Sequence, residues 1–315
     1  MQKTNYLIIA ALIVIITVGV VAGIYLTRTP AGKSSSTLKV LATFYPLYDF
    51  AQNVGGDKIK AAILVPETVD VHNFEPTPSD IENIATADVL IYNGAGLESS
   101  WLSSSVSASG NTKLVLVDTS ENIPLLQVAR QFQAGNRTVD PHIWLDPVLA
   151  KQQVNSVLQG LIKADPADSQ YFMQNAKMYE AKLDALNSQI VTITASPNVK
   201  TRYFVTFHEA FAYFAKEYNL TQVPISGPFQ EEPSPTDIQN VINAIHRYHL
   251  LYVGYESLEN PAIPQSIASQ TNATLVHMDP IEGVTVQEKA DGKDYISLMQ
   301  ETVSNIQLVL DNVGS

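Results

Sequence analysis

The sequence predicts an α/β fold with two similar parallel-sheet lobes, one long rigid helix that bridges them, and a membrane-spanning segment at the N-terminus. Apolar runs of strand length alternate with helical stretches, as in parallel sheets covered on both faces. Short motifs also recur at a nearly constant offset, and a long uncharged run stands near the start. We expect four parts: 1–37, an anchor or signal segment with a tether; 38–166, the N-terminal lobe; 167–197, the linking helix; and 198–315, the C-terminal lobe.

The first part is defined by an uncharged run of 21 residues from Tyr6 to Leu26. At about 1.5 Å per residue, this run is long enough to span the apolar core of a bilayer. The small residues Val20-Val21-Ala22 leave a cleaved signal peptide as the alternative. We favour an uncleaved anchor, and in either case the lobes are expected outside the cytoplasm.

Each lobe contains four apolar runs of strand length. In the N-terminal lobe we expect strands at Leu38–Phe44, Ile59–Val65, Val89–Tyr92 and Lys113–Val117, and in the C-terminal lobe at Tyr203–Phe207, Gln222–Ile225, Leu251–Tyr255 and Ala273–Met278. Between the lobes, apolar residues recur at helical spacing from Asp168 to Thr194. This pattern predicts a helix of about 27 residues, about 40 Å long, which would brace both lobes.

Three short motifs occur once in each half, in the same order. Pro78 and Pro235 occupy the same place in the first motif, where each is expected near the start of a helix. Ordered matches at offsets of 157, 163 and 161 residues indicate two similar lobes. The pairs are Glu75–Ile81 with Glu232–Ile238, Thr43-Phe44 with Thr206-Phe207, and Leu116–Asp118 with His277–Asp279.

The composition excludes several kinds of protein. A net charge of −12 would repel the phosphates of nucleic acids, so no nucleic-acid partner is expected. The chain has no cysteine, hence no disulfide, no thiolate metal ligand and no lipid-bearing cysteine.

Five residues are candidate metal ligands: His72, His142, His208, Asp279 and Glu282. Most are placed in loops after expected strands, where open α/β sheets bind their ligands. Three imidazoles and one carboxylate can complete a divalent metal site without cysteine.

His142 is flanked by two aspartates, Asp140 and Asp146. A carboxylate beside a histidine ligand can fix which ring nitrogen faces the metal. Glu256 is expected to make only structural contacts.

These motifs resemble the cluster A-I metal-binding proteins, which are the zinc- and manganese-binding components of ABC importers. The matching stretches are His72–Asp80, Asn93–Glu98, Asp140–Pro147, Phe207–Phe211, Glu232–Pro235 and Asp279–Gly283. The resemblance covers Leu38 to the C-terminus and implies that a metal is held between the lobes by His72, His142 and His208. It leaves Asp279 and Glu282 as equal candidates for the fourth ligand.

The resemblance also implies a function, which is that of a high-affinity receptor delivering a divalent ion to an ABC permease in the membrane. Zinc is the first choice, because a nitrogen-rich ligand set favours zinc over the harder manganese. Manganese is the second choice. We expect a monomer, and not an enzyme.

Two alternatives come from other classes of protein. One is an adhesin-like surface protein in which the metal is only structural. The other is an extracellular zinc hydrolase, which needs an open coordination position and a general base, for which Glu209 or Glu282 could serve. The zinc-protease helix motif is incomplete, because Ala212 stands where its second histidine would be.

Overall fold

The structure is a computed structural model that describes residues 37–133 and 137–314. Residues Leu38–Ser315 form one compact unit. The predicted membrane segment lies outside the described residues. Among the residues described, no helix is both long enough and apolar enough to cross a membrane.

All eight predicted strands are present. In the N-terminal half (residues 38–164) four parallel strands form one sheet in the order β2-β1-β3-β4, and β1 pairs with both β2 and β3. The strands of this sheet are β1 Leu38–Ala42, β2 Ile59–Ile63, β3 Val89–Tyr92 and β4 Val115–Asp118.

The C-terminal half (residues 195–314) differs from the N-terminal half in its sheet, although two similar lobes were expected. Its strands form two parallel pairs, β5 with β6 and β7 with β8. β5 lies beside β7, and a Cβ atom at Gly254 would be 2.5 Å from the Val205 carbonyl oxygen. At the end of β5 the backbone N–H of His208 is bound by a side chain: it donates to the Glu256 carboxylate at 3.2 Å. These strands are β5 Tyr203–His208, β6 Thr221–Ser226, β7 Tyr252–Tyr255 and β8 Thr274–His277.

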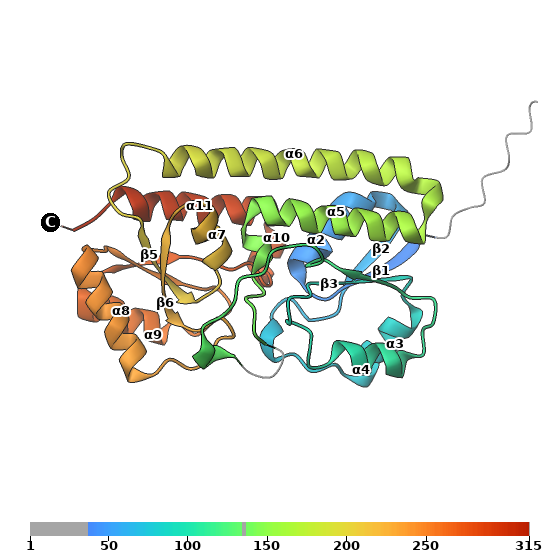
Figure 1. Cartoon of the computed structure of the whole chain (residues 1–315), viewed down its shortest axis with the longest axis horizontal. Coiled ribbons are helices and arrows are strands. Elements are labelled where there is room, and N and C mark those ends of the chain that lie inside the picture. The colour runs from blue at the N-terminus through green and yellow to red at the C-terminus, as the bar shows by residue number, and fades with distance from the viewer. Residues whose placement is uncertain (1–36, 134–136, 315) are drawn as a thin grey trace, which may run out of the picture. The chain divides into compact units, whose positions relative to one another are not determined.

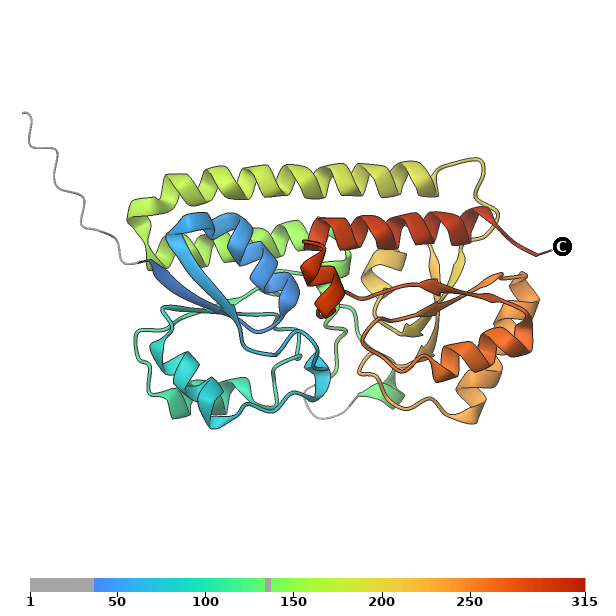
Figure 2. The same cartoon turned by 180° about the vertical axis from the view of Figure 1, so that it is seen from behind.

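Helices connect the strands and cover the sheets (Figures 1 and 2). The α-helices are α2 Tyr45–Gly55, α3 Pro78–Thr86, α4 Leu102–Ser109, α5 Pro147–Ala164, α6 Ser169–Thr194, α7 Ala212–Glu217, α8 Pro235–Tyr248, α9 Ala262–Thr271, α10 Val286–Ala290 and α11 Tyr295–Asp311. The short 3₁₀ helices are η1 Gly56–Lys58, η2 Val71–Asn73, η3 Arg130–Phe132, η4 Ile143–Leu145 and η5 Pro166–Asp168.

The first sequence motif forms the same helix start in both halves. α3 begins at Pro78 and α8 at Pro235, as predicted. In each, a hydroxyl side chain before the proline and an aspartate in the first turn form a reciprocal capping box. The repeated sequence motif therefore forms the same local structure in both halves.

The predicted long helix is α6, with 26 residues. Its buried side chains include Phe172, Tyr179 and Leu186. They pack against α2 and α5 of the N-terminal half and against α11 of the C-terminal half (Figure 1). Since 26 residues span about 39 Å, α6 is long enough to contact both halves. The lobe boundaries at 166 and 198 stay a prediction.

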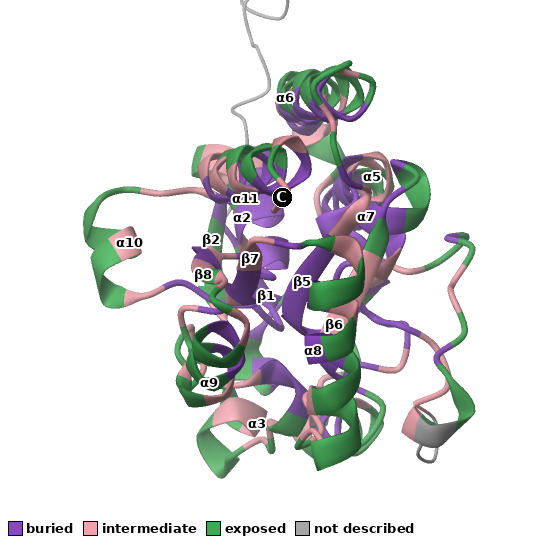
Figure 3. Ribbon diagram, turned by 90° about the vertical axis from the view of Figure 1, so that its left-hand side faces the viewer, coloured by how far each residue is buried: buried purple, intermediate pink, exposed green. Residues whose placement is uncertain are grey.

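The two halves share one hydrophobic core beneath α6. Residues of β1, α6, β5 and α11 belong to the same buried cluster, which includes Phe50, Leu183, Phe204 and Met299. Figure 3 shows buried strands at the centre and exposed outer faces on α8 and α9. A shared core of this kind holds the carboxyl ends of strands from both halves close together.

Candidate metal centre

The structure brings four of the five predicted ligands together, with the ligand atoms of His72, His142, His208 and Glu282 within 4.8 Å of one another. His72 lies in η2 after β2, His142 lies directly before η4, and His208 is the last residue of β5. Glu282 lies in the loop after β8. Both halves therefore contribute to one cluster, the only one of this kind among the described residues.

Four of the six distances between the ligand atoms are close to the edges of a tetrahedral zinc site. Glu282 Oε1 is 3.1 Å from His72 Nε2, 3.3 Å from His142 Nε2 and 3.4 Å from His208 Nε2. The Nε2 atoms of His142 and His208 are 3.2 Å apart. A tetrahedron with zinc–ligand bonds of about 2.0–2.1 Å has edges of about 3.3 Å. The separation of all four ligand atoms stays within 4.8 Å, so they are placed to surround one metal ion.

The cluster is buried. The exposed fraction is 0% for His142 and His208, 2% for His72 and 8% for Glu282. Glu282 also lines a cavity of about 120 Å³ that none of the three histidines lines. The glutamate is therefore the side of the cluster that is nearest to solvent.

Two carboxylates fix the histidine tautomers. Asp140 lies 2.7 Å from His142 Nδ1, and Glu256 lies 2.8 Å from His208 Nδ1. Because a carboxylate only accepts, both Nδ1 atoms carry a proton, and in the neutral form of each ring the Nε2 lone pair faces the cluster. Of the two aspartates beside His142, only Asp140 has this role, since Asp146 caps the start of α5.

Each histidine also has its backbone N–H held by a carboxylate. Asp70 accepts from His72 at 2.8 Å, and Asp140 accepts from His142 at 2.9 Å. Both pairs have the spacing Asp-X-His, which is the Asx-turn pattern. His72 differs in one respect, because within the described residues its buried Nδ1 atom has no hydrogen-bond partner.

Asp279 lies outside the cluster, and its equal weighting with Glu282 is not supported by the geometry. Its two oxygens accept the backbone N–H groups of Ile281 at 2.8 Å and Ser257 at 3.0 Å. One of them is also 3.3 Å from His277 Nε2. Asp279 thus shapes the turn that presents Glu282.

The repeat explains this role. Asp118 occupies the position of Asp279 in the N-terminal half, and it accepts the backbone N–H of Ser120 at 2.9 Å. Asp118 is the last residue of β4, Asp279 follows β8 by two residues, and both close the same i to i+2 turn. The repeat in the sequence therefore predicts the turn that Asp279 forms.

The cluster shifts the pKa values of its members in opposite directions. Burial lowers the pKa of His208, but Glu256 and Glu282 outweigh it and raise this pKa well above its ordinary value. Burial also lowers the pKa of His142, but Asp140 and Glu282 outweigh this effect, so the pKa is raised. Burial raises the pKa of Glu282, yet the nearby histidines hold it well below its usual range. Without metal, the site thus stabilises protonated histidines next to an ionised carboxylate.

These shifts predict that zinc affinity rises with pH. Zinc must displace the protons held at His142 and His208, so acid competes with the metal. We expect the logarithm of the association constant to rise by about one to two per pH unit between pH 6 and 7. Titration against a chelator at pH 6, 7 and 8 measures this slope. An affinity that stays constant across this range would contradict the arrangement.

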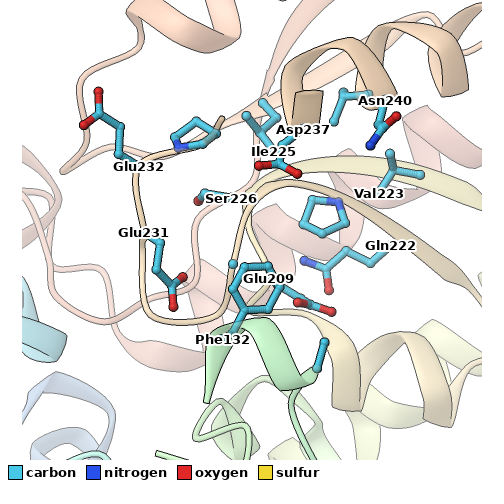
Figure 4. Close-up of a pocket in the computed structure, with 15 residues that line it drawn as sticks. Phe132, Glu209, Gln222, Val223, Ile225, Ser226, Glu231, Glu232, Asp237 and Asn240 are labelled. Atoms are coloured by element: carbon cyan, nitrogen blue, oxygen red, sulfur yellow. The ribbon is translucent and has the colours of Figure 1, made fainter. Parts of the chain in front are cut away.

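A larger cavity, of about 390 Å³, lies over β6 and the start of α8 (Figure 4). Its lining includes Phe132, Glu209, Glu231 and Asp237, but none of the four clustered residues. Glu209 follows His208 in the sequence, yet its side chain lines this second cavity.

A buried cluster of three histidines and one glutamate, contributed by two α/β halves, is the ligand set of a metal-binding receptor. The chain belongs to the ZnuA family, described as the periplasmic component A of a zinc-uptake complex, and the match covers residues 40–308. It is 31% identical over 290 residues to the high-affinity zinc uptake system protein ZnuA of Bacillus subtilis, covering 89% of this chain and 90% of that one.

Solved structures show the same fold. The Zn(II)-bound ZnuA-like domain of Streptococcus pneumoniae AdcA matches with a TM-score of 0.76 at 26% identity, over 88% of this chain and 100% of that one. The laminin-binding protein Lmb of Streptococcus agalactiae matches with a TM-score of 0.75 at 25% identity, over 87% of this chain and 100% of that one. That protein is described as bifunctional, with adhesin and metal-transporting activity.

Proposed function

We propose that this chain is an extracytoplasmic zinc receptor, in which His72, His142, His208 and Glu282 bind the ion and hold the two halves around it. The convergence of three Nε2 atoms on one glutamate oxygen, at 3.1–3.4 Å, carries this proposal. The loaded receptor then delivers zinc to an ABC permease in the membrane. Membership in a zinc-uptake family supports that partner.

The site is expected to bind zinc more tightly than manganese. Three imidazoles and a single carboxylate are softer ligands than manganese prefers, and four buried ligands leave no room for the six-coordinate oxygen-rich site typical of that ion. The bound site carries a formal charge of about +1 from zinc and Glu282. The carboxylates of Asp140 and Glu256 lie directly behind two histidines and offset this charge.

The receptor is held at the outer surface of a membrane by the uncharged run Tyr6–Leu26, and it acts as a monomer. The absence of cysteine supports anchoring by this segment, because no thiol is present to carry a lipid.

Competitive titration tests the proposal. Chelator-stripped protein should bind zinc at nanomolar concentration or tighter and bind manganese at least about 100-fold more weakly. Circular dichroism should show the stripped protein folded, because a receptor must release its ion and reload. Weak zinc binding, or tighter manganese binding, would refute the proposal.

The hydrolase alternative lacks a free general base at the cluster. Of its two candidates, Glu209 lines the second cavity, and Glu282 completes the tetrahedron. Ser257, His277 and Asp279 also lie together, but the serine and the aspartate both contact the same ring nitrogen, Nε2 of His277. A catalytic triad needs them on opposite nitrogens.

One observation supports the adhesin alternative, namely the similarity to Lmb of Streptococcus agalactiae. If zinc were only structural, the stripped protein would unfold. The circular dichroism measurement above therefore separates this alternative from the receptor.

A further inference from the structure

Trp144 lies two residues after His142, in η4, and is completely buried. Its ring centroid is 5.2 Å from that of His142 and 4.7 Å from that of Phe44. Its indole N–H and its backbone carbonyl contact two segments of the C-terminal half. The indole Nε1 donates to the carbonyl oxygen of Pro280 at 2.7 Å, and the backbone oxygen accepts from the Tyr295 hydroxyl.

The bond to Pro280 reaches the turn that presents Glu282. Ile281, between these two residues, has φ 60°, a conformation that β-branched residues rarely adopt. Such a turn persists only when its surroundings hold it. Asp279 holds it from within the C-terminal half. Trp144 holds it from the N-terminal half, directly after a metal ligand.

We propose that Trp144 is a positioning residue that fixes the Glu282 carboxylate relative to His142. This inference rests on the proposed function. The indole contacts no ligand atom through a hydrogen bond and acts through the Pro280 carbonyl. Because His142 and Trp144 are two residues apart, a shift of the Glu282 turn away from His142 breaks the Trp144–Pro280 bond. The bond therefore sets the distance between His142 Nε2 and Glu282 Oε1, which lie in different halves and are 3.3 Å apart.

The first test compares two tryptophan variants. Trp144→Phe keeps an aromatic ring and removes the N–H donor, so zinc affinity should fall by about 10- to 100-fold, as for other residues that support metal ligands. Trp101→Phe is the matched control, since Trp101 is the other tryptophan of the chain and packs against Phe74. Its affinity should stay within about threefold of the parent. Equal affinity in Trp144→Phe and the parent would overturn the proposal.

A double variant separates positioning from general damage. With Glu282→Gln in place, Trp144→Phe should weaken the residual zinc binding by less than about twofold, because the carboxylate that it positions is gone. The same fold loss in both backgrounds would overturn the proposal. If the parent protein itself binds no zinc, the proposed function fails instead.

A third measurement does not depend on the folding of Trp144→Phe. The Trp144 indole N–H, identified by NMR in Trp101→Phe protein, should exchange with solvent deuterium more slowly after zinc is added. In the parent protein the Trp101 indole N–H should exchange at the same rate with and without zinc. An unchanged exchange rate for Trp144 would overturn the inference.

Discussion

Glu282→Gln is expected to weaken zinc binding by about 100- to 1,000-fold, because it removes the one charged ligand. The lost oxygen, Oε1, is the atom that all three histidine Nε2 atoms share at 3.1–3.4 Å. An amide of the same shape carries no charge to offset that of zinc in a buried site. Isothermal titration against a competing chelator measures the loss.

Two other acidic residues serve as controls for Glu282→Gln. Glu259 lines the same small cavity as Glu282, and burial raises its pKa to about 7, but it is not part of the cluster. Glu259→Gln should change zinc affinity by less than about threefold. Asp279→Asn should cost less than Glu282→Gln, since it disturbs only the turn. The reverse order would assign the fourth ligand to Asp279.

Gly283→Ala is expected to weaken zinc binding by at least about tenfold and to lower thermal stability. A Cβ atom at Gly283 would collide with the backbone oxygen of Glu67, so one of the two segments must move. Backbone atoms cannot rotate away as the end of a side chain can. Because Glu282 is the preceding residue, its carboxylate moves with the turn. Chelator competition and thermal unfolding measure the two effects.

Gly110→Ala provides the matched control for Gly283→Ala. Gly110 has φ 63°, and a Cβ atom there would meet nothing within 4 Å. The variant should lose about 1 kcal/mol of stability from the left-handed backbone and keep its zinc affinity. If Gly283→Ala also kept its affinity, the close contact with Glu67 would not control the position of Glu282.

Much of the fold could be predicted from the sequence because its patterns are local. The eight strands are apolar runs, and α6 follows from helical spacing between Asp168 and Thr194. The division of the C-terminal half into two pairs was missed. How β5 and β7 lie against each other is decided by contacts such as that of Gly254 with Val205, which join segments far apart in the sequence.

The candidate site was predictable to the level of residue type. Three histidines were identified by their loops and by the family resemblance, but Asp279 and Glu282 could not be separated by composition. The role of Glu256 was also missed, although it directly follows β7, beside the strand that ends in His208. Parallel strands end at one edge of a sheet, so their following residues are candidates for contact.

Trp144 shows a different limit of prediction. A tryptophan two residues after a histidine is ordinary in a sequence. Its role depends on the Pro280 carbonyl, 136 residues away along the chain. Only the folded structure brings the two groups together.

A crystal structure of the zinc-loaded protein, with diffraction recorded at the zinc absorption edge, tests the central claim most directly. The four-ligand site predicts one anomalous peak about 2.0–2.1 Å from the Nε2 atoms of His72, His142 and His208 and from Oε1 of Glu282. A peak bound by Asp279 in place of Glu282, or one that keeps an open water position, would contradict it.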